Sequence, residues 1–152
     1  FVGMMANDCI SNIPGKVKCL LIIRNMAEIK IKLSQILTLT NGRFGPYFVA
    51  PVVAGLDKIS DTEYQPVICT YDSIGYRQHS GNFEVAGTGH DFLYGCCEAF
   101  YKEDLEPEQL YQVISNVLLS ALDRDSLSGW GAYVYILTPN DLTVRALKTR
   151  MD

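Results

Sequence analysis

The spacing of apolar residues predicts three helices in this chain. The clearest one begins at Pro107, and its apolar side chains recur at intervals of three and four residues. Its apolar positions are Leu110, Val113, Ile114, Val117, Leu118 and Ala121. Proline suits the first helical turn, where its missing N–H costs nothing. Shorter patterns predict helices over 26–40 and 90–101, and Asn41-Gly42 ends the first of these.

Both shorter helices have an apolar stripe that we expect to be buried. In the first helix the stripe contains Ile29, Leu33, Ile36, Leu37 and Thr40. In the second it contains Phe92, Leu93, Cys96, Ala99 and Phe100. A stripe of this width normally faces a core.

Short apolar runs bounded by turn residues predict the strands. The predicted strands cover 47–56, 66–71, 72–78, 83–88, 132–137 and 142–148. A polar loop is expected over 57–65, and Pro51 marks an edge or a bulge in the first strand. Residues 1–6 fit a buried strand, whereas 16–23 fits a strand or a helix equally well.

The order of these elements places the chain in the α+β class. A helix comes first, strands and then two helices follow, and the last two strands form a hairpin around the turn at Pro139-Asn140-Asp141. Neither an internal repeat nor a linker interrupts the 152 residues. We therefore expect a single domain over 1–152.

Composition excludes several classes of protein. Thirteen Lys and Arg residues against seventeen Asp and Glu residues give a net charge of −4, and the basic residues are scattered. That balance argues against nucleic acid as a partner. The apolar share of 48% argues against disorder. No apolar run approaches the roughly 20 residues that span a bilayer, so we expect no membrane segment.

The cysteines predict neither a disulfide framework nor a metal site. They are Cys9, Cys19, Cys69, Cys96 and Cys97, an odd number without CxxC spacing. The two histidines, His79 and His90, are far apart in the sequence. A reducing intracellular compartment fits this usage best, and no metal or other cofactor is expected.

Three groups of residues are candidates for a catalytic or ligand-binding site within this chain. Cys97 shares a helix face with His90, but a separation of seven residues places them about 10 Å apart, too far for a nucleophile and its base. Asp123 and Asp125 point apart if both lie on a helix, so they do not share a proton. Residues 87–89, Gly-Thr-Gly, fit a phosphate cradle or a tight turn before a helix.

Several stretches together resemble the proteasome beta-subunit family, and within it the type-3 branch. They are RFGPYFVAPVVAGLD at 43–57, VAGT at 85–88, YGCCE at 94–98, LEPEQL at 105–110, ALDRDSLSGWG at 121–131 and LKTRMD at 147–152. Their order and spacing match over about 33–152, whereas residues 1–32 match poorly.

The resemblance implies a fold. Members of the family have a four-layer αββα sandwich, the N-terminal nucleophile hydrolase fold, with two stacked antiparallel sheets. If residues 1–6 correspond to an internal strand of that fold, the first two strands are lacking here. A sheet without those strands exposes unpaired backbone groups, so such a chain needs its neighbours.

The resemblance also implies roles for residues. Catalytic members use an N-terminal threonine, whereas this chain opens with Phe1 and type-3 subunits are non-catalytic, so no catalytic residue is expected. Asp125, Ser128 and Gly129 match the turn that supports the nucleophile in active relatives. Asp72 matches a segment that faces the neighbouring trypsin-like subunit, and Tyr76 follows it at a position where relatives often carry cysteine, so both are expected to wall that cleft.

The resemblance therefore predicts a structural subunit of the 20S core in ubiquitin-dependent protein degradation, found in cytoplasm and nucleus. Its expected partners are the other beta subunits of the ring, the alpha-ring subunits and the opposite beta ring. For Asp72 a second interpretation is open, in which it caps its own backbone turn. Two alternatives for the chain are a standalone hydrolase using Cys97 or Asp125, and the non-functional product of a truncated gene.

Overall fold

The computed structural model describes residues 2–6, 20–23, 34–39, 49–61, 63–79 and 82–151. The chain divides into two compact units. Unit 1 comprises Phe1–Asn12 and Gly87–Asp152, and unit 2 comprises Ile13–Ala86. Helices and mostly antiparallel sheets are present in the manner of the α+β class, while the single domain over 1–152 stays a prediction.

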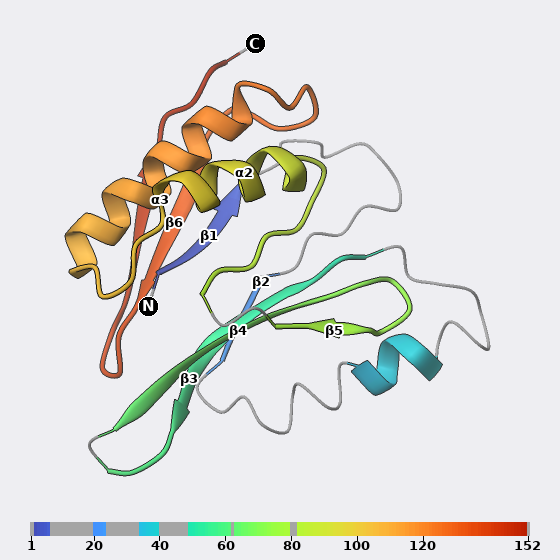
Figure 1. The fold of residues 1–152 in the computed structure, drawn as a ribbon, viewed down its shortest axis with the longest axis vertical. Helices are drawn as coiled ribbons and strands as arrows, with labels where there is room; N and C mark the ends of the chain where they lie inside the picture. Colours follow the sequence, from blue (N-terminus) through green and yellow to red (C-terminus); the bar gives the residue numbers. More distant parts are fainter. Residues whose placement is uncertain are drawn as a thin grey trace. The chain divides into compact units, whose positions relative to one another are not determined.

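Unit 1 is a three-stranded antiparallel sheet with a helix along one face. The strand order is β1 (Val2–Ala6), β6 (Ala132–Leu137) and β7 (Leu142–Leu147), with β6 in the centre. Helix α3 (Pro107–Leu122) packs on β6, and α2 (His90–Phe100) lies beside α3 (Figure 1). The hairpin of β6 and β7 and the helix that begins at Pro107 are confirmed.

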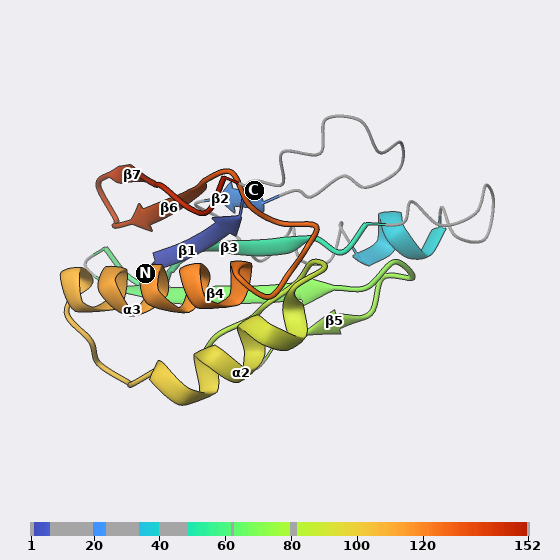
Figure 2. The ribbon, with the colours of Figure 1, turned by 90° about the horizontal axis from the view of Figure 1, so that it is seen from above.

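The core of unit 1 forms where the stripe of α3 meets β6. Val134 and Ile136 of β6 are buried against Leu110 and Ile114 of α3. Val117 and Leu118, further along α3, are also buried. Burial of each such side chain contributes about 1.5–3 kcal/mol to the stability of the unit. Figure 2 shows α3 running along the sheet.

The first turn of α3 explains why the helix begins where it does. Glu106 is the N-cap, and a capping box joins its side chain to the Gln109 backbone while the Gln109 side chain accepts a hydrogen bond from the Glu106 N–H. Pro107 occupies the first helical position. These contacts satisfy N–H groups that a helix start otherwise leaves unpaired.

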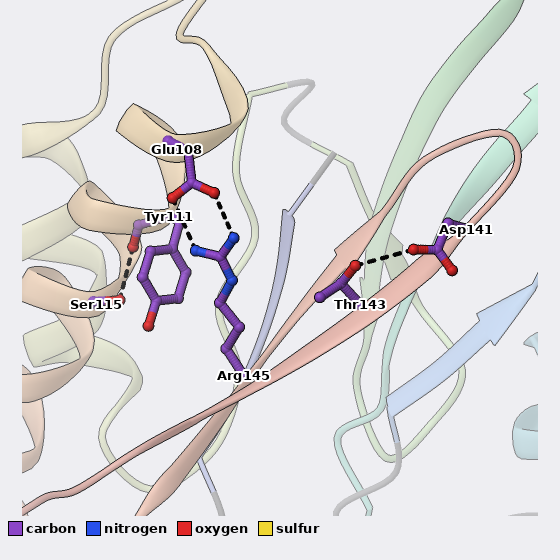
Figure 3. A network of polar contacts seen from close by, with 6 residues as sticks. All are labelled: Glu108, Tyr111, Ser115, Asp141, Thr143 and Arg145. Carbon is purple, nitrogen blue, oxygen red and sulfur yellow. Dashed lines mark hydrogen bonds and ion pairs between the residues drawn. The ribbon is translucent and has the colours of Figure 1, made fainter.

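An ion pair and a ring contact fasten β7 to α3. Arg145 of β7 donates hydrogen bonds from Nη1 and Nη2 to the two carboxylate oxygens of Glu108, the first over 2.8 Å. Its guanidinium also lies 4.5 Å from the centre of the Tyr111 ring (Figure 3). The hydrogen bonds from Arg145 lower the pKa of Glu108. Arginine suits this place because its planar fork binds a carboxylate and covers a ring at once.

Unit 2 is a four-stranded sheet with a short helix against it. The strand order is β2 (Leu20–Ile23), β3 (Val52–Lys58), β4 (Tyr64–Tyr71) and β5 (Arg77–Gln78), and only β2 and β3 run parallel. The helix over 34–39 places Leu37 in a buried cluster with Val53, Cys69 and Tyr71. The rest of the helix predicted over 26–40 lies outside the described residues.

Several predicted boundaries in unit 2 are wrong. Strand β3 starts at Val52 rather than 47, so Pro51 precedes the strand, where its carbonyl accepts the Tyr71 N–H. The predicted loop over 57–65 is shorter than expected, because β3 continues to Lys58 and β4 begins at Tyr64. Cross-strand pairing extends both strands into polar sequence that has low strand propensity.

Two predicted strands are also corrected. Of 72–78 only Arg77–Gln78 is a strand, because Asp72 bonds the backbone around it into a tight loop. Residues 83–88 form no strand, and Glu84 accepts a hydrogen bond from the Thr70 hydroxyl of β4 over 3.1 Å. A side-chain contact holds this segment where a backbone ladder was expected.

The expected burial of the two shorter stripes is wrong in part. In α2 only Leu93 is buried, while Phe92 and Phe100 are 46% and 50% exposed. In the helix over 34–39, Leu37 is buried and Ile36 is exposed. Amphipathic spacing identified these helices, but it does not say whether the same chain covers the stripe.

Candidate functional site

A buried carboxylate forms the centre of the turn that follows α3. Asp125 is only 7% exposed. Its Oδ2 accepts hydrogen bonds from the Thr88 hydroxyl over 2.6 Å and the Ser128 hydroxyl over 2.7 Å. Its Oδ1 accepts the Leu127 N–H over 3.1 Å. Three donors thus compensate the cost of burying this group.

The backbone around Asp125 explains how the turn forms. Helix α3 ends at Leu122, whose carbonyl accepts the Asp125 N–H over 3.3 Å. The Asp125 carbonyl then accepts the Ser128 N–H over 3.3 Å. A short side chain that bonds its own backbone two residues on is typical of aspartate in turns. Asp125 and Ser128 are therefore brought together as the resemblance implied, and Gly129 follows in the same turn.

The turn at 87–89 closes against this carboxylate. A methyl group placed on Gly89 would lie 3.1 Å from Asp125 Oδ2, so this close approach favours a residue without a side chain. Gly87 has a φ of +111°, a conformation that glycine adopts readily. The carboxylate beside Thr88 would repel a phosphate, which excludes the phosphate cradle and leaves the tight turn.

The second predicted group, around Asp72, lies on an exposed loop between β4 and β5. Asp72 Oδ1 accepts the N–H groups of Ile74 over 3.1 Å and of Tyr76 over 2.7 Å. The capping interpretation of Asp72 is therefore confirmed. Both Asp72 and Tyr76 are exposed, and the exposed fraction of Tyr76 is 69%. The loop therefore exposes a carboxylate and a phenol ring on the surface of unit 2.

A glycine that sequence reasoning missed fixes this loop to the helix over 34–39. The Gly75 carbonyl accepts the Ser34 hydroxyl over 2.7 Å, and the Ile74 carbonyl accepts the Thr38 hydroxyl over 3.1 Å. Gly75 has a φ of +94° and is buried. The signal that could have found it is the glycine itself, three residues after an aspartate that starts a turn.

The cysteine candidates lack the properties of a nucleophile. Burial raises the pKa of the Cys97 thiol to about 11, and the neighbouring Cys96 and Glu98 add to that shift. At neutral pH the thiol is therefore protonated, and the thiolate is the reactive form. His90 pairs with Asp91 through Nε2 and Oδ1 at 3.0 Å. The two carboxylates of the other candidate pair differ in environment, since Asp123 is exposed and Asp125 is buried.

In the described part of the chain, no three His, Cys, Asp or Glu side chains are grouped so that they could hold a metal ion. None of the described helices is long and apolar enough to cross a membrane.

Comparison with known proteins finds a family model described as "Proteasome subunit" that matches residues 21–137. The chain is 54% identical over 110 residues to a proteasome subunit beta type-3 of Picea mariana. It is 53% identical to the Drosophila melanogaster protein of that name and 50% identical to that of Saccharomyces cerevisiae. Each match covers 72% of this chain and 52% of the relative, so the chain spans about half the length of the curated relatives it matches.

Proposed function

This chain belongs to the proteasome subunit family, and from that membership we propose that it is a non-catalytic, type-3-like beta subunit of the 20S core. In this role it forms part of the beta ring and helps to wall the substrate cleft of the neighbouring trypsin-like subunit in ubiquitin-dependent protein degradation. The observation that carries the proposal is the identity of 44–54% to proteins named beta type-3.

The local chemistry supports a structural role. Each oxygen of the Asp125 carboxylate accepts a hydrogen bond within unit 1, so the carboxylate stabilises the turn in which it lies. Ser128 commits its hydroxyl to the same carboxylate. The raised pKa of Cys97 disfavours its thiolate. These features favour a subunit over the alternative of a standalone hydrolase.

We further propose the αββα arrangement of the N-terminal nucleophile hydrolase fold. Family membership implies that fold, and the antiparallel sheet of unit 1 with α3 on one face is consistent with one sheet and one helical layer of it. The proposed partners are other beta subunits, alpha-ring subunits and the opposite beta ring, in the cytoplasm and nucleus. The exposed rings of Phe92 and Phe100 on α2 support burial against such partners.

The assembly state tests this proposal directly. We expect the tagged chain, expressed in cells and purified under mild conditions, to elute with a large hetero-oligomer that contains alpha and beta subunits. A species near the chain mass of 17.0 kDa that hydrolyses peptides by itself would instead favour the standalone enzyme. A 17.0 kDa species without activity would favour the truncated gene product.

The role of Asp72 in the cleft can be separated from its role in the loop. Asp72→Asn keeps an oxygen for the Ile74 and Tyr76 N–H groups but removes the charge. Loss of an attraction of about 1 kcal/mol toward a basic substrate side chain should lower kcat/KM about fivefold for peptides cleaved after arginine. Peptides cleaved after apolar or acidic residues should be cut at unchanged rates by the same purified particles.

The matched control is Asp61→Asn, which removes an exposed carboxylate from the β3–β4 hairpin of the same unit. It should leave all three cleavage rates unchanged. Asp72→Ala should lower cleavage after arginine and also weaken the loop. Equal losses in all three activities for Asp72→Asn would remove the cleft role and leave only an effect on assembly.

A further inference from the structure

The segment that follows β7 crosses the turn that contains Asp125. We call residues Lys148–Met151 the strap. The strap reaches both ends of the turn, since Arg150 Nη1 donates to the Asp123 carbonyl over 3.2 Å. At the other end, the Arg150 carbonyl accepts the Trp130 N–H over 3.2 Å, and the Thr149 hydroxyl accepts the Gly131 N–H over 2.6 Å.

The backbone that the strap holds is strained. Trp130 has a φ of +63°, in the left-handed region that residues with a side chain avoid at a cost of about 1–2 kcal/mol. Gly131 follows at +128°. Trp130 is 61% exposed, so burial of its indole ring offsets little of that cost. Strain of this kind persists only where surrounding contacts fix the backbone, and the contacts here come from the strap.

We propose that the strap is a conformational latch for the turn from Asp123 to Gly131. When its contacts are lost, the turn relaxes at Trp130 and Gly131 while the rest of unit 1 keeps its fold. The register of the sheet supports this separation, because the β6–β7 ladder is complete at Ala132 and Leu147, just before the strap begins. The proposal concerns this chain alone and does not depend on the proposed function.

Thr149→Val tests the latch because it keeps the shape of the side chain and removes the acceptor of the Gly131 N–H. We expect the Gly131 amide of the whole 152-residue chain to exchange hydrogen at least about tenfold faster, a change of roughly 1.4 kcal/mol in the local opening equilibrium. Amides of β6 from Val134 onward should exchange at their original rates. Thr149→Ser should restore slow exchange, since it restores the hydroxyl.

Thr143→Val is the matched control, because Thr143 is also a threonine of the same hairpin and its hydroxyl bonds only locally to Asp141. It should leave Gly131 exchange unchanged. Arg150→Ala provides a second route, with faster exchange at the turn and Met151→Ala as its control. Unchanged Gly131 exchange in Thr149→Val and Arg150→Ala would overturn the latch. So would exchange that rises uniformly through β6 and α3.

Discussion

Asp125→Ala is expected to lower the free energy of unfolding by about 4 kcal/mol, which is a large part of the roughly 5–15 kcal/mol of a typical domain. The change leaves the hydroxyls of Thr88 and Ser128 and the Leu127 N–H without the acceptor they have now. The three hydrogen bonds are part-buried, so each donor that loses its partner costs at most about 1–3 kcal/mol, and the costs overlap because the donors share one carboxylate. Denaturant unfolding of the whole chain, or of its assembly, measures the loss.

The control for this variant is Asp123→Ala, two residues away on the same turn. Asp123 is exposed, so its removal should cost less than about 0.5 kcal/mol. Thr88→Val should cost less than Asp125→Ala, and it should cost nothing further when Asp125 is already alanine. Full additivity of Thr88→Val and Asp125→Ala would contradict a shared network. A loss as small as that of Asp123→Ala would contradict the importance of the carboxylate.

Gly75→Ala is expected to destabilise unit 2 by about 3 kcal/mol. The added methyl group would lie 2.5 Å from Thr38 Oγ1 and 2.7 Å from the Ser34 carbonyl oxygen. The hydroxyl can rotate away, but the carbonyl belongs to a helix and cannot. The φ of +94° adds strain for any residue with a side chain. The midpoint of denaturant unfolding should fall accordingly.

Gly95→Ala is the matched control, because it adds the same methyl group at a helical site with open space. Nothing lies within 4 Å of the methyl group there, and alanine favours α2 by up to about 1 kcal/mol over glycine. The two variants should therefore shift stability in opposite directions. Thr38→Ala should not rescue Gly75→Ala, since the Ser34 carbonyl stays in place. Equal stability of the two alanine variants would show that the loop moves away from the helix without cost.

The parts of the fold that were predictable depend on contacts close in sequence. Helix α3 has its stripe, its proline and its capping box within sixteen residues, and the alternation of Val134 and Ile136 predicts β6. The strand predicted over 83–88 is wrong because a strand depends on a partner strand. There a Thr70–Glu84 hydrogen bond is made instead, and periodicity carries no information about it.

The site was predictable in its residue types and not in its contacts. Resemblance to a family identified Asp125 and Ser128, which lie three residues apart. It included Thr88 in a motif but did not pair it with Asp125, which the Thr88 hydroxyl reaches from 37 residues away. Nor did it show what the strap binds, since the bond from Gly131 to Thr149 spans 18 residues and its donor is a backbone group. Contacts of this range are a property of the folded chain.

Pro66 has a consequence for how unit 2 behaves beside other molecules. It lies in β4 opposite Leu56, and within the described strands β5 pairs only with Thr70 and Tyr71, so this length of β4 is a sheet edge. Proline has no N–H to offer to an incoming strand. A strand of another chain can therefore form only an interrupted ladder there, which protects the hairpin against edge-to-edge aggregation.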